Sequence, residues 1–529
     1  METVGFAGKC KGMGILTFAR CFSFSKAQHT LAAIADSVHI PSPAVSLNSS
    51  PDEQGYADTP EWKMFKSKDL GLSTSMINKP ALTVLKGLQK TGYEAYLVGG
   101  CVRDLVLKRT PKDFDVLTTA DLQEIRRNFS RCNIIGRRFP ICHVHVRETI
   151  VEVSSFKTSE RKGKNDFVEK KQKPTSCNDR DYARWRNCMR RDFTINGLMY
   201  DPYENVVYDY IGGLEDLKAG KVRTVIPAHS SFAEDCARIL RGIRIAARLN
   251  FKFSRDTACA IKDHSHYILR LDKGRIMMEM NYMLAFGTGE ASLRLLWRFG
   301  LLEILLPMQA AYLVSQGFRR RDKRSNMLLV LFTKLDELLA PDRPCHCSLW
   351  VSLLAFHLAL AGEPQDALVI TAFALSVRNG GNLKKAMDKS RKIYKKSKSF
   401  SPEVLDVVES ESNEKVMNKI LDLAGEVKST LSAMTDADAV SQAMSKYYPQ
   451  APFSDLVFIT IPTFSRVRSI FACVGGHREE RVRSKEDVEI NYRSLVDGEL
   501  KELRFVFAKI VIDSLYVTHF DKKSDTDPS

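Results

Sequence analysis

Hydrophobic and polar positions follow two different periods along the middle of the chain. Leu82, Leu85 and Leu88 recur at three-residue steps, which predicts a helix over 80–93. Residues 94–98 form a short apolar run, and residues 150–153 alternate apolar and charged side chains, so each segment is predicted to be a strand. The chain therefore mixes helices and strands up to about residue 225 and is helix-like beyond it.

The segment from residue 231 to 249 is predicted to be one helix with two unlike faces. Its apolar face consists of Ile239, Leu240, Ile243, Ala246 and Ala247. Its charged face consists of Arg238, Arg241, Arg244 and Arg248. Such a stripe is either a solvated surface or a binding face for phosphate groups.

A glycine pair follows the strand predicted at 94–98. Gly99 and Gly100 precede a short helical segment at 105–108, and glycine lets the backbone approach a ligand closely. Exposed N–H groups and the helix dipole favour an anion there, and Arg103 adds a guanidinium suited to phosphate oxygens. The segment predicts a phosphate-binding turn, with an ordinary tight turn as the alternative.

Two carboxylates lie two residues apart at the start of the next predicted strand. Alternate strand residues share a face, so Asp113 and Asp115 are expected to project together while Phe114 enters the core. Such a pair beside a phosphate-binding turn predicts a two-metal site for Mg²⁺, with Mn²⁺ as a substitute. Glu152 is the candidate third catalytic carboxylate. The alternative is a surface turn without chemistry.

Net charge, the length of apolar runs and the cysteine spacing limit the classes of partner and site that we expect. The 79 Lys and Arg against 63 Asp and Glu give a net charge of +16, which favours a polyanionic partner. No run of eighteen apolar residues occurs, so we expect no membrane span. The twelve cysteines lack regular spacing and are expected to be reduced thiols, with Cys345-His346-Cys347 in a loop rather than at zinc.

The N-terminal region has the composition of a targeting segment. Residues 1–40 are basic, poor in acidic residues and contain serine, which predicts a transit peptide to the mitochondrion or plastid. The alternative is a disordered basic tail on a nuclear or cytoplasmic protein. Residues 41–75 are rich in Pro and Ser and are expected to be a disordered linker, so the fold is predicted to begin near Ile77.

Several segments resemble the class II nucleotidyltransferases, the family of tRNA CCA-adding enzymes and bacterial-type poly(A) polymerases. These segments are LVGGCVRD (97–104), PKDFDVLT (111–118), RRDFTINGLMYDP (190–202), IGGLEDLKAGKVR (211–223) and EDCARILRGIRIAARLNF (234–251). The resemblance covers residues 80–310. It implies an α+β fold, with a small mixed β-sheet nucleotidyltransferase head followed by an all-α neck, body and tail.

The resemblance also implies domain limits. The head is expected at 76–225, a helical neck that binds RNA at 226–310, and a helical C-terminal region at 311–529. The C-terminal region contains a basic segment, 378–398, which either contacts phosphates or is a solvated linker.

The resemblance assigns further residues to the nucleotide. Asp192 and Asn196, four apart and expected on one helical face, would hold ribose hydroxyls, although Asp192 is also suited to cap a helix that begins at Phe193. Asp235 and Arg238, one turn apart, would read the edge of the incoming base. The nucleotide-binding set is then Gly99, Gly100, Arg103, Arg191, Asp192, Asn196, Asp235, Arg238 and Arg241.

Two further features are open to either a functional or a structural interpretation. Residues 157–191 are polar and basic and are expected to form a flexible excursion, in which Tyr182 and Trp185 are suited to stack on RNA bases. His357 lies in an apolar helix and is expected to be a core residue.

Segments 137–146 and 274–307 resemble poly(A) polymerases more than CCA-adding enzymes. The expected activity is a polynucleotide adenylyltransferase, which adds AMP from ATP to the 3′ ends of mRNA or tRNA and releases pyrophosphate. The alternatives are a CCA-adding enzyme, which would also use CTP, and a non-catalytic RNA-binding protein on the same scaffold. The sequence makes no prediction of the oligomeric state.

Overall fold

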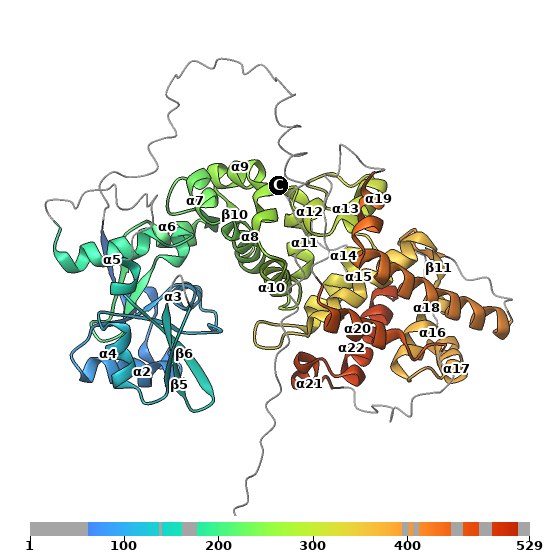
Figure 1. Cartoon of the computed structure of the whole chain (residues 1–529), viewed down its shortest axis with the longest axis horizontal. Helices are drawn as coiled ribbons and strands as arrows, with labels where there is room; N and C mark the ends of the chain where they lie inside the picture. Colours follow the sequence, from blue (N-terminus) through green and yellow to red (C-terminus); the bar gives the residue numbers. More distant parts are fainter. Residues whose placement is uncertain are drawn as a thin grey trace, which may run out of the picture. The chain divides into compact units, whose positions relative to one another are not determined.

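The computed structural model describes residues 62–136, 140–160, 177–393, 401–405, 412–445, 459–475 and 489–516 (Figure 1). The predicted transit peptide, 1–40, lies outside the described residues, as does the predicted linker as far as residue 61. The described chain consists of a β-sheet region followed by helices, which confirms the predicted α+β class.

The sheet has eight strands in the order β1-β8-β7-β2-β3-β6-β5-β4. These strands are β1 (Lys63–Lys66), β8 (Val206–Asp209), β7 (Met199–Asp201), β2 (Ala95–Val98), β3 (Asp115–Thr118), β6 (Thr149–Ser155), β5 (Ile141–Val146) and β4 (Cys132–Ile135). β3 and β6 run parallel, whereas the other neighbours are antiparallel, so the sheet is mixed.

Successive residues of the central strands contribute to two separate hydrophobic cores, one on each face of the sheet. Leu97 and Val116 belong to one core, which includes residues of α2 (Lys79–Lys90), α3 (Gly100–Val106) and α4 (Leu122–Asn128). Tyr96 and Leu117 belong to the other core, with residues of α5 (Asp179–Met189). Because successive strand residues point to opposite faces, helices cover both faces of the sheet.

The expectation of a disordered linker is wrong for residues 62–75. Lys63–Lys66 forms the edge strand β1 beside β8, and two 3₁₀ turns follow at Ser67–Leu70 and Thr74–Met76. Leu72 is buried in the core. Local composition did not reveal this segment because its partner strand is about 140 residues away in the sequence.

The helical region begins with α7 (Ala228–Glu234) and α8 (Ala237–Leu249). The next helices are α9 (Arg255–Asp263), α10 (Lys273–Leu284), α11 (Gly289–Arg298), α12 (Leu302–Leu305), α13 (Pro307–Ser315), α14 (Met327–Leu338), α15 (Cys347–Gly362) and α16 (Ala367–Arg378). The last are α17 (Leu383–Ile393), α18 (Asn413–Thr435), α19 (Ala437–Ser445), α20 (Ile461–Phe471), α21 (Tyr492–Asp497) and α22 (Leu500–Leu515). In the described ranges no helix combines the length and apolar character that crossing a membrane requires.

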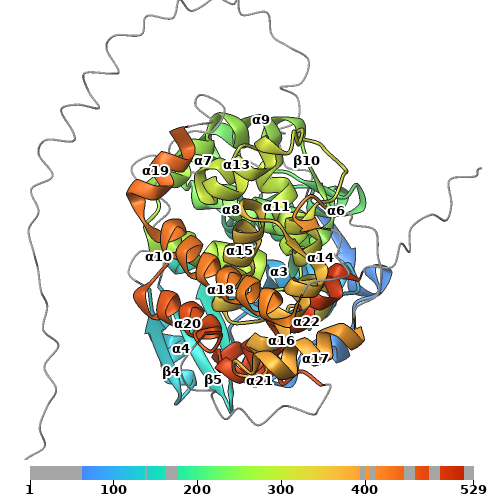
Figure 2. The same cartoon turned by 90° about the vertical axis from the view of Figure 1, so that its right-hand side faces the viewer.

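The C-terminal helices share one aromatic core. α15 contacts α18, α20 and α22, and these helices lie together in Figure 2. Phe356 and Phe373 stack with ring centroids 5.8 Å apart, and Phe507 meets Phe356 edge to face at 5.4 Å. His357 is fully buried here with its ring edge on Tyr312, which confirms that it is a core residue.

α8 belongs to two hydrophobic cores. Ile239, Leu240 and Ile243 pack in the core of the helical region. Ile245 and Leu249, further along the helix, pack in the core under the sheet. The position of α8 is therefore fixed from both sides, and its arginines are held at a defined place beside the sheet.

Candidate active site

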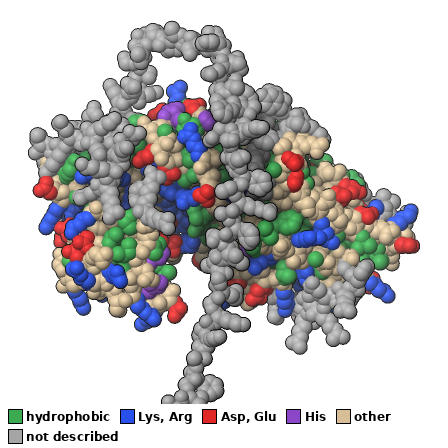
Figure 3. Space-filling view, viewed as in Figure 1, with side chains coloured by type: hydrophobic (Ala, Val, Ile, Leu, Met, Phe, Trp, Pro, Cys, Tyr) green, Lys and Arg blue, Asp and Glu red, His purple; other side chains and the backbone are tan. Residues whose placement is uncertain are grey.

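A cleft of about 620 Å³ lies between the sheet region and the helices that follow it. Its walls come from the turn between β2 and α3, the start of β3, the segment 190–196 and the length of α8. Figure 3 shows Lys and Arg side chains gathered left of the centre, over α8. Every residue of the predicted set lines this cleft except Glu152.

Asp113 and Asp115 lie in this cleft, although not as alternate residues of one strand. β3 begins at Asp115, so Asp113 belongs to the preceding loop and is exposed, while Phe114 is buried as expected. Burial raises the pKa of Asp115 to about 6, and the charges of Glu152 and Asp113 add to the rise while Arg191 opposes it. A divalent cation would relieve this accumulation of negative charge, and carboxylate oxygens are suitable ligands for Mg²⁺.

Glu152 lies next to Asp115 but faces a different group. Val116 pairs with Val153 in the parallel ladder, which puts Glu152 level with Asp115. The Glu152 side chain is 53% exposed and lies 3.6 Å from His143 Nε2. Across the described ranges, no group of three or more His, Cys, Asp and Glu side chains is placed to hold a metal ion. Glu152 does not line the cleft, but its charge acts on Asp115 from the neighbouring strand.

The glycine turn brings a basic and an acidic side chain together. Gly99 has φ 78° and ψ −139°, a backbone conformation that residues other than glycine rarely adopt. A Cβ atom on Gly99 would lie 3.0 Å from Arg191 Nη1 and 3.6 Å from Asp115 Oδ2. α3 begins directly after it, at Gly100, and not near residue 105 as the pattern predicted. The bare backbone of Gly99 lets Arg191 lie close to the carboxylate.

A hydrogen-bonded network links the two walls of the cleft. Arg103 is only 6% exposed, and its Nε and Nη2 lie 2.9 and 2.7 Å from Asp104 Oδ1. Arg103 Nη1 donates to Asn196 Oδ1 at 2.8 Å, and Asn196 Nδ2 donates to Asp192 Oδ1 at 2.9 Å. Arg241 Nη1 donates to Asp192 Oδ2 at 3.1 Å. Arg103 is thus held in place by Asp104 and Asn196 while it also lines the cleft.

Asp192 and Asn196 do not lie on an α-helix. A 3₁₀ turn spans Thr194–Asn196, and Asp192 Oδ1 accepts from the Phe193 backbone N–H at 2.8 Å. Burial alone would raise the pKa of Asp192, but Arg241 and the hydrogen bonds from Asn196 and the backbone outweigh it and lower the pKa. The predicted helix and its cap were wrong, although the two side chains do meet.

Each arginine of the α8 stripe is paired with a carboxylate in the described structure. The pairs are Arg238 with Glu234 at 2.8 Å, Arg241 with Asp192 at 3.1 Å, Arg244 with Glu279 at 3.5 Å and Arg248 with Asp104 at 3.4 Å. All four arginines also line the cleft. The stripe is therefore not merely a solvated face.

The predicted single helix over 231–249 is interrupted at Asp235. This residue has extended dihedral angles, φ −145° and ψ 97°, and its Oδ1 accepts from the Ala237 N–H at 3.1 Å. Arg238 Nη1 reaches back to Ser231 Oγ at 3.0 Å and to Glu234 Oε2. Asp235 and Arg238 both line the cleft, but on either side of a helix break rather than on one continuous helical face.

The structure adds residues that the sequence interpretation missed. Asp104 anchors both Arg103 and Arg248, and it was visible in the segment LVGGCVRD without an assigned role. Lys112, Tyr282 and Phe286 also line the cleft. No periodicity pointed to these three, because residues 112 and 282 meet only through the tertiary fold.

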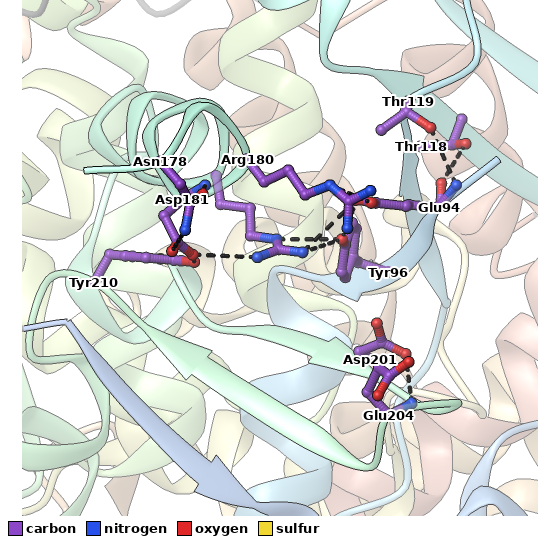
Figure 4. Close-up of polar contacts among 11 residues, drawn as sticks. Glu94, Tyr96, Thr118, Thr119, Asn178, Arg180, Asp181, Asp201, Glu204 and Tyr210 are labelled. Carbon is purple, nitrogen blue, oxygen red and sulfur yellow. Dashed lines mark hydrogen bonds and ion pairs between the residues drawn. The ribbon is translucent and has the colours of Figure 1, made fainter. Parts of the chain in front are cut away.

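The prediction of a flexible excursion over 157–191 is wrong for the C-terminal end of that range. Residues 161–176 lie outside the described residues. α5 occupies Asp179–Met189, and Arg184 in it is buried. Its Nη2 donates to Tyr96 Oη at 2.6 Å and its Nη1 to Asp181 Oδ1 at 3.2 Å. Figure 4 shows Tyr96, Glu94, Asp181 and Tyr210 converging on this place. Trp185 is 4% exposed, so it is not free to stack on an RNA base.

The described part of the basic segment 378–398 is an amphipathic helix. α17 buries Ala386, Met387 and Ser390. Its exposed basic residues are Lys384, Lys385, Lys389, Arg391 and Lys392. Residues 394–398 lie outside the described residues.

Comparison with known proteins identifies the region that contains the cleft. Residues 95–223 match the family model of the poly(A) polymerase head domain. Residues 250–313 match the model described as the probable RNA and SrmB-binding site of polymerase A. Both matches fall in the region that carried the sequence resemblance.

Two relatives illustrate the extent of the similarity. Poly(A) polymerase I of Haemophilus influenzae is 34% identical over 282 residues, which are 52% of this chain and 61% of that protein. The CCA-adding enzyme of Streptococcus uberis is 34% identical over 203 residues, 38% of this chain and 48% of that protein. The chain therefore spans less than two thirds of the length of these curated relatives.

The crystal structure of the Bacillus stearothermophilus CCA-adding enzyme in complex with CTP aligns with 82% of this chain and 97% of that one. The TM-score is 0.41 and the identity 21%. Over residues 95–223 and 250–313, the chain is therefore similar to the poly(A) polymerases and CCA-adding enzymes of the class II nucleotidyltransferases.

Proposed function

We propose that this chain is a template-independent RNA 3′-end nucleotidyltransferase that adds AMP from ATP and releases pyrophosphate. The observation that carries the proposal is one cleft that holds both Asp113 and Asp115 and the arginine face of α8. Carboxylates bind metal ions and arginines bind phosphates, so the cleft offers the two kinds of group that nucleotidyl transfer needs.

In the proposed reaction the RNA 3′ hydroxyl attacks the α-phosphorus of ATP, a new P–O bond forms, and the bond to the pyrophosphate oxygen breaks. Mg²⁺ ions held by Asp113 and Asp115, or Mn²⁺ in their place, would activate the hydroxyl and stabilise charge on the phosphates. Gly99 allows the triphosphate to approach the backbone, with Arg191 beside it. Arg241 contributes positive charge to the opposite wall of the cleft.

We assign the ribose and the base to the second wall. Asp192 and Asn196 hold ribose hydroxyls, and the network through Arg103 and Arg241 fixes their orientation. Asp235 and Arg238 read the base edge. Arg238 lines the cleft and uses Nη1 to bond Ser231 and Glu234. Because Nη1 is already hydrogen-bonded, the Arg238 guanidinium has less rotational freedom. This favours one arrangement of hydrogen-bonding groups on the base.

Poly(A) addition is favoured over CCA addition by the extent of similarity. The poly(A) polymerase I relative aligns over 282 residues and the CCA-adding relative over 203, at the same 34% identity. A tRNA without its CCA end, given ATP with and without CTP, tests the choice. A tail of A residues from ATP alone supports poly(A) addition, whereas a single A that requires prior addition of two C residues supports CCA addition.

A non-catalytic RNA-binding protein would not need the carboxylate pair. The proposal therefore requires that wild-type protein with Mg²⁺ extends RNA and releases pyrophosphate, and that chelation with EDTA stops extension. Full-length protein that binds RNA but incorporates no nucleotide with Mg²⁺ or Mn²⁺ would favour the binding role instead.

We also propose import into the mitochondrion or plastid, on the basic and acid-poor composition of residues 1–40. A fluorescent protein fused to residues 1–40 should enter the organelle. A fusion in which the basic residues Lys9, Lys11, Arg20 and Lys26 are replaced by Gln should remain outside, and uniform cytoplasmic or nuclear signal from both would contradict the proposal.

A further inference from the structure

Two aromatic rings line the cleft. Tyr282 belongs to α10. Phe286 lies about one helical turn after Tyr282, just beyond the end of that helix. Their ring centroids are 5.3 Å apart at an interplanar angle of 48°. Both side chains are partly exposed and both line the cleft. The rings therefore present an apolar surface inside a cleft that is otherwise rich in charge.

A lysine occupies this surface in the described structure. Lys112 Nζ lies 4.9 Å from the Phe286 centroid and 5.5 Å from the Tyr282 centroid. The Lys112 side chain is exposed, and within the described ranges no carboxylate pairs with it. A cation over two rings is held weakly at an exposed site, so a flat ligand can displace it. Lys112 also precedes Asp113, so the loop that supplies this cation also carries a candidate metal ligand.

Contacts with neighbouring side chains hold the Tyr282 ring in position. The Arg244 guanidinium lies 5.2 Å from the Tyr282 centroid, and Arg244 is itself paired with the buried carboxylate of Glu279 at 3.5 Å. Arg275 donates to Glu279 at 2.9 Å from within α10. This cluster ties α10 to α8 and keeps the Tyr282 ring in place, so the platform is preorganised rather than formed on binding.

We propose that Tyr282 and Phe286 form the stacking platform for the last base of the RNA 3′ end, which displaces Lys112 from the rings. The inference rests on the proposed function and adds to it the position of the primer. Aromatic rings bind bases through their faces without regard to sequence. The first primer ends in whatever base the RNA carries and later primers end in A, so a site that tolerates any base is what this position needs.

The incoming nucleotide has a separate place. Asp235 and Arg238, the proposed base-reading pair, lie at the start of α8, while Arg244 is six residues further along the same helix. Six residues rise about 9 Å along a helix axis. On this separation along α8 we assign the incoming base to Asp235 and Arg238 and the primer base to the rings.

The test compares two RNA primers that differ only at their 3′ terminus, one with an intact last base and one with an abasic last residue. Affinity is measured without nucleotide on the full-length chain, and the ratio of the two dissociation constants isolates the contribution of the last base. We expect the wild type to prefer the intact primer by about tenfold, in line with one stacked base. Tyr282→Leu combined with Phe286→Leu should bring the ratio close to one.

Three variants make the result specific. Tyr282→Phe keeps the ring and should retain the ratio. Tyr267→Leu removes another tyrosine that contacts an arginine, Arg270 at 3.7 Å, but that does not line the cleft, and it should retain the ratio as well. Lys112→Gln removes the resident cation and should raise the ratio, although total affinity falls with the lost charge. Because Lys112 is exposed, this variant also serves if the double variant does not fold.

A ratio that stays at the wild-type value in the double leucine variant and in Lys112→Gln, in a protein that still extends RNA, would overturn the platform and leave the proposed function standing. A wild-type protein that neither binds nor extends RNA would overturn both. A loss of the ratio in Tyr267→Leu would also overturn the assignment, because the base would then depend on aromatic residues outside the cleft.

Discussion

Arg103 Nη1 donates to Asn196 Oδ1 at 2.8 Å, and this one bond connects residues 93 positions apart in the sequence. Through Asn196 and Asp192 the link continues to Arg241 on α8. The glycine-turn helix, the segment 190–196 and α8 are therefore joined by one hydrogen-bonded network that connects the two walls of the cleft. Because each member is buried or half-buried, loss of one leaves its neighbours without a partner.

Asn196→Ala should weaken both the fold and the nucleotide site. Arg103 and Asp192 each lose a hydrogen-bond partner, which costs about 1–3 kcal/mol when the group is buried. We expect a lower thermal unfolding midpoint and a higher KM for ATP. Asn128→Ala removes an exposed bond to Thr91 and is the matched control. Equal behaviour of the two variants would contradict the role of the network.

Asp113→Asn and Asp115→Asn should each lower nucleotide incorporation at least a hundredfold, because both remove a negative charge that metal binding requires. RNA affinity should change little, since carboxylates do not bind phosphates directly and we assign RNA contacts to basic and aromatic side chains. Filter binding and primer extension on the same preparations separate the two effects. Asp69→Asn, at an exposed position of the sheet region, should leave both unchanged. Substantial activity in Asp115→Asn with Mg²⁺ would remove the two-metal proposal.

Asp235→Asn is expected to lower the preference for ATP more than the total turnover. Asn keeps an oxygen that can accept from the Ala237 N–H, so the helix break is preserved, while one acceptor for the base amine becomes a donor. The loss of discrimination should amount to about 1–3 kcal/mol, measured as kcat/KM for all four nucleotides on one primer. Glu234→Gln, which loosens Arg238, should have a smaller effect in the same direction. Unchanged ATP preference in Asp235→Asn would make this residue a structural cap.

The exposed face of α17 is expected to contact RNA phosphates. Replacing Lys384, Lys385, Lys389 and Lys392 with Gln should reduce the slope of log affinity against log salt by about 0.7 for each phosphate that the helix no longer neutralises. A control with the same net charge replaces the exposed Lys86, Lys90, Lys218 and Lys221, which lie on the sheet region. Equal slopes in the two variants would show that only total charge matters.

His357 should make the fold sensitive to acid. Burial lowers its pKa to about 3, below the usual 6.5, so the unfolded chain takes up a proton that the folded chain refuses. Stability is therefore lost as the pH falls below about 6.5, by up to about 1.4 kcal/mol per pH unit. His357→Phe should raise the thermal midpoint at about pH 5 more than at about pH 8. His266→Phe, at an exposed position, should not, and a pH-independent effect of His357→Phe would contradict this account.

The order of motifs in the sequence was sufficient to predict the α+β class and most of the residues that meet in the cleft. Asp113, Asp115, Asp235 and Arg238 all line it as expected. The reasons for their positions were less accurate. The sequence interpretation placed Asp235 inside a continuous helix, whereas the chain has an extended residue there. A periodic pattern is judged over many residues, so it does not reveal one extended residue within it.

Partners of charged residues were the least predictable part. Arg184 and Arg103 both have sequence surroundings that suggest solvent or phosphate, yet each is buried against groups far away in the chain, Tyr96 and Asn196 respectively. Composition describes only neighbours in sequence, whereas burial of a guanidinium depends on tertiary neighbours. The same limit applies to Glu152, whose place beside Asp115 required the parallel pairing of β3 with β6.

α8 contributes to the core under the sheet and to the core of the helical region, and this double membership restricts how its length can vary. One residue inserted near Ala246 would rotate everything after it by about 100° relative to everything before it. Leu249 would then leave the core under the sheet, and Arg248 would turn away from Asp104, while Ile239 and Ile243 stayed in place. A change of length in a loop would leave both cores intact, whereas α8 has to keep its register from Ala237 to Leu249.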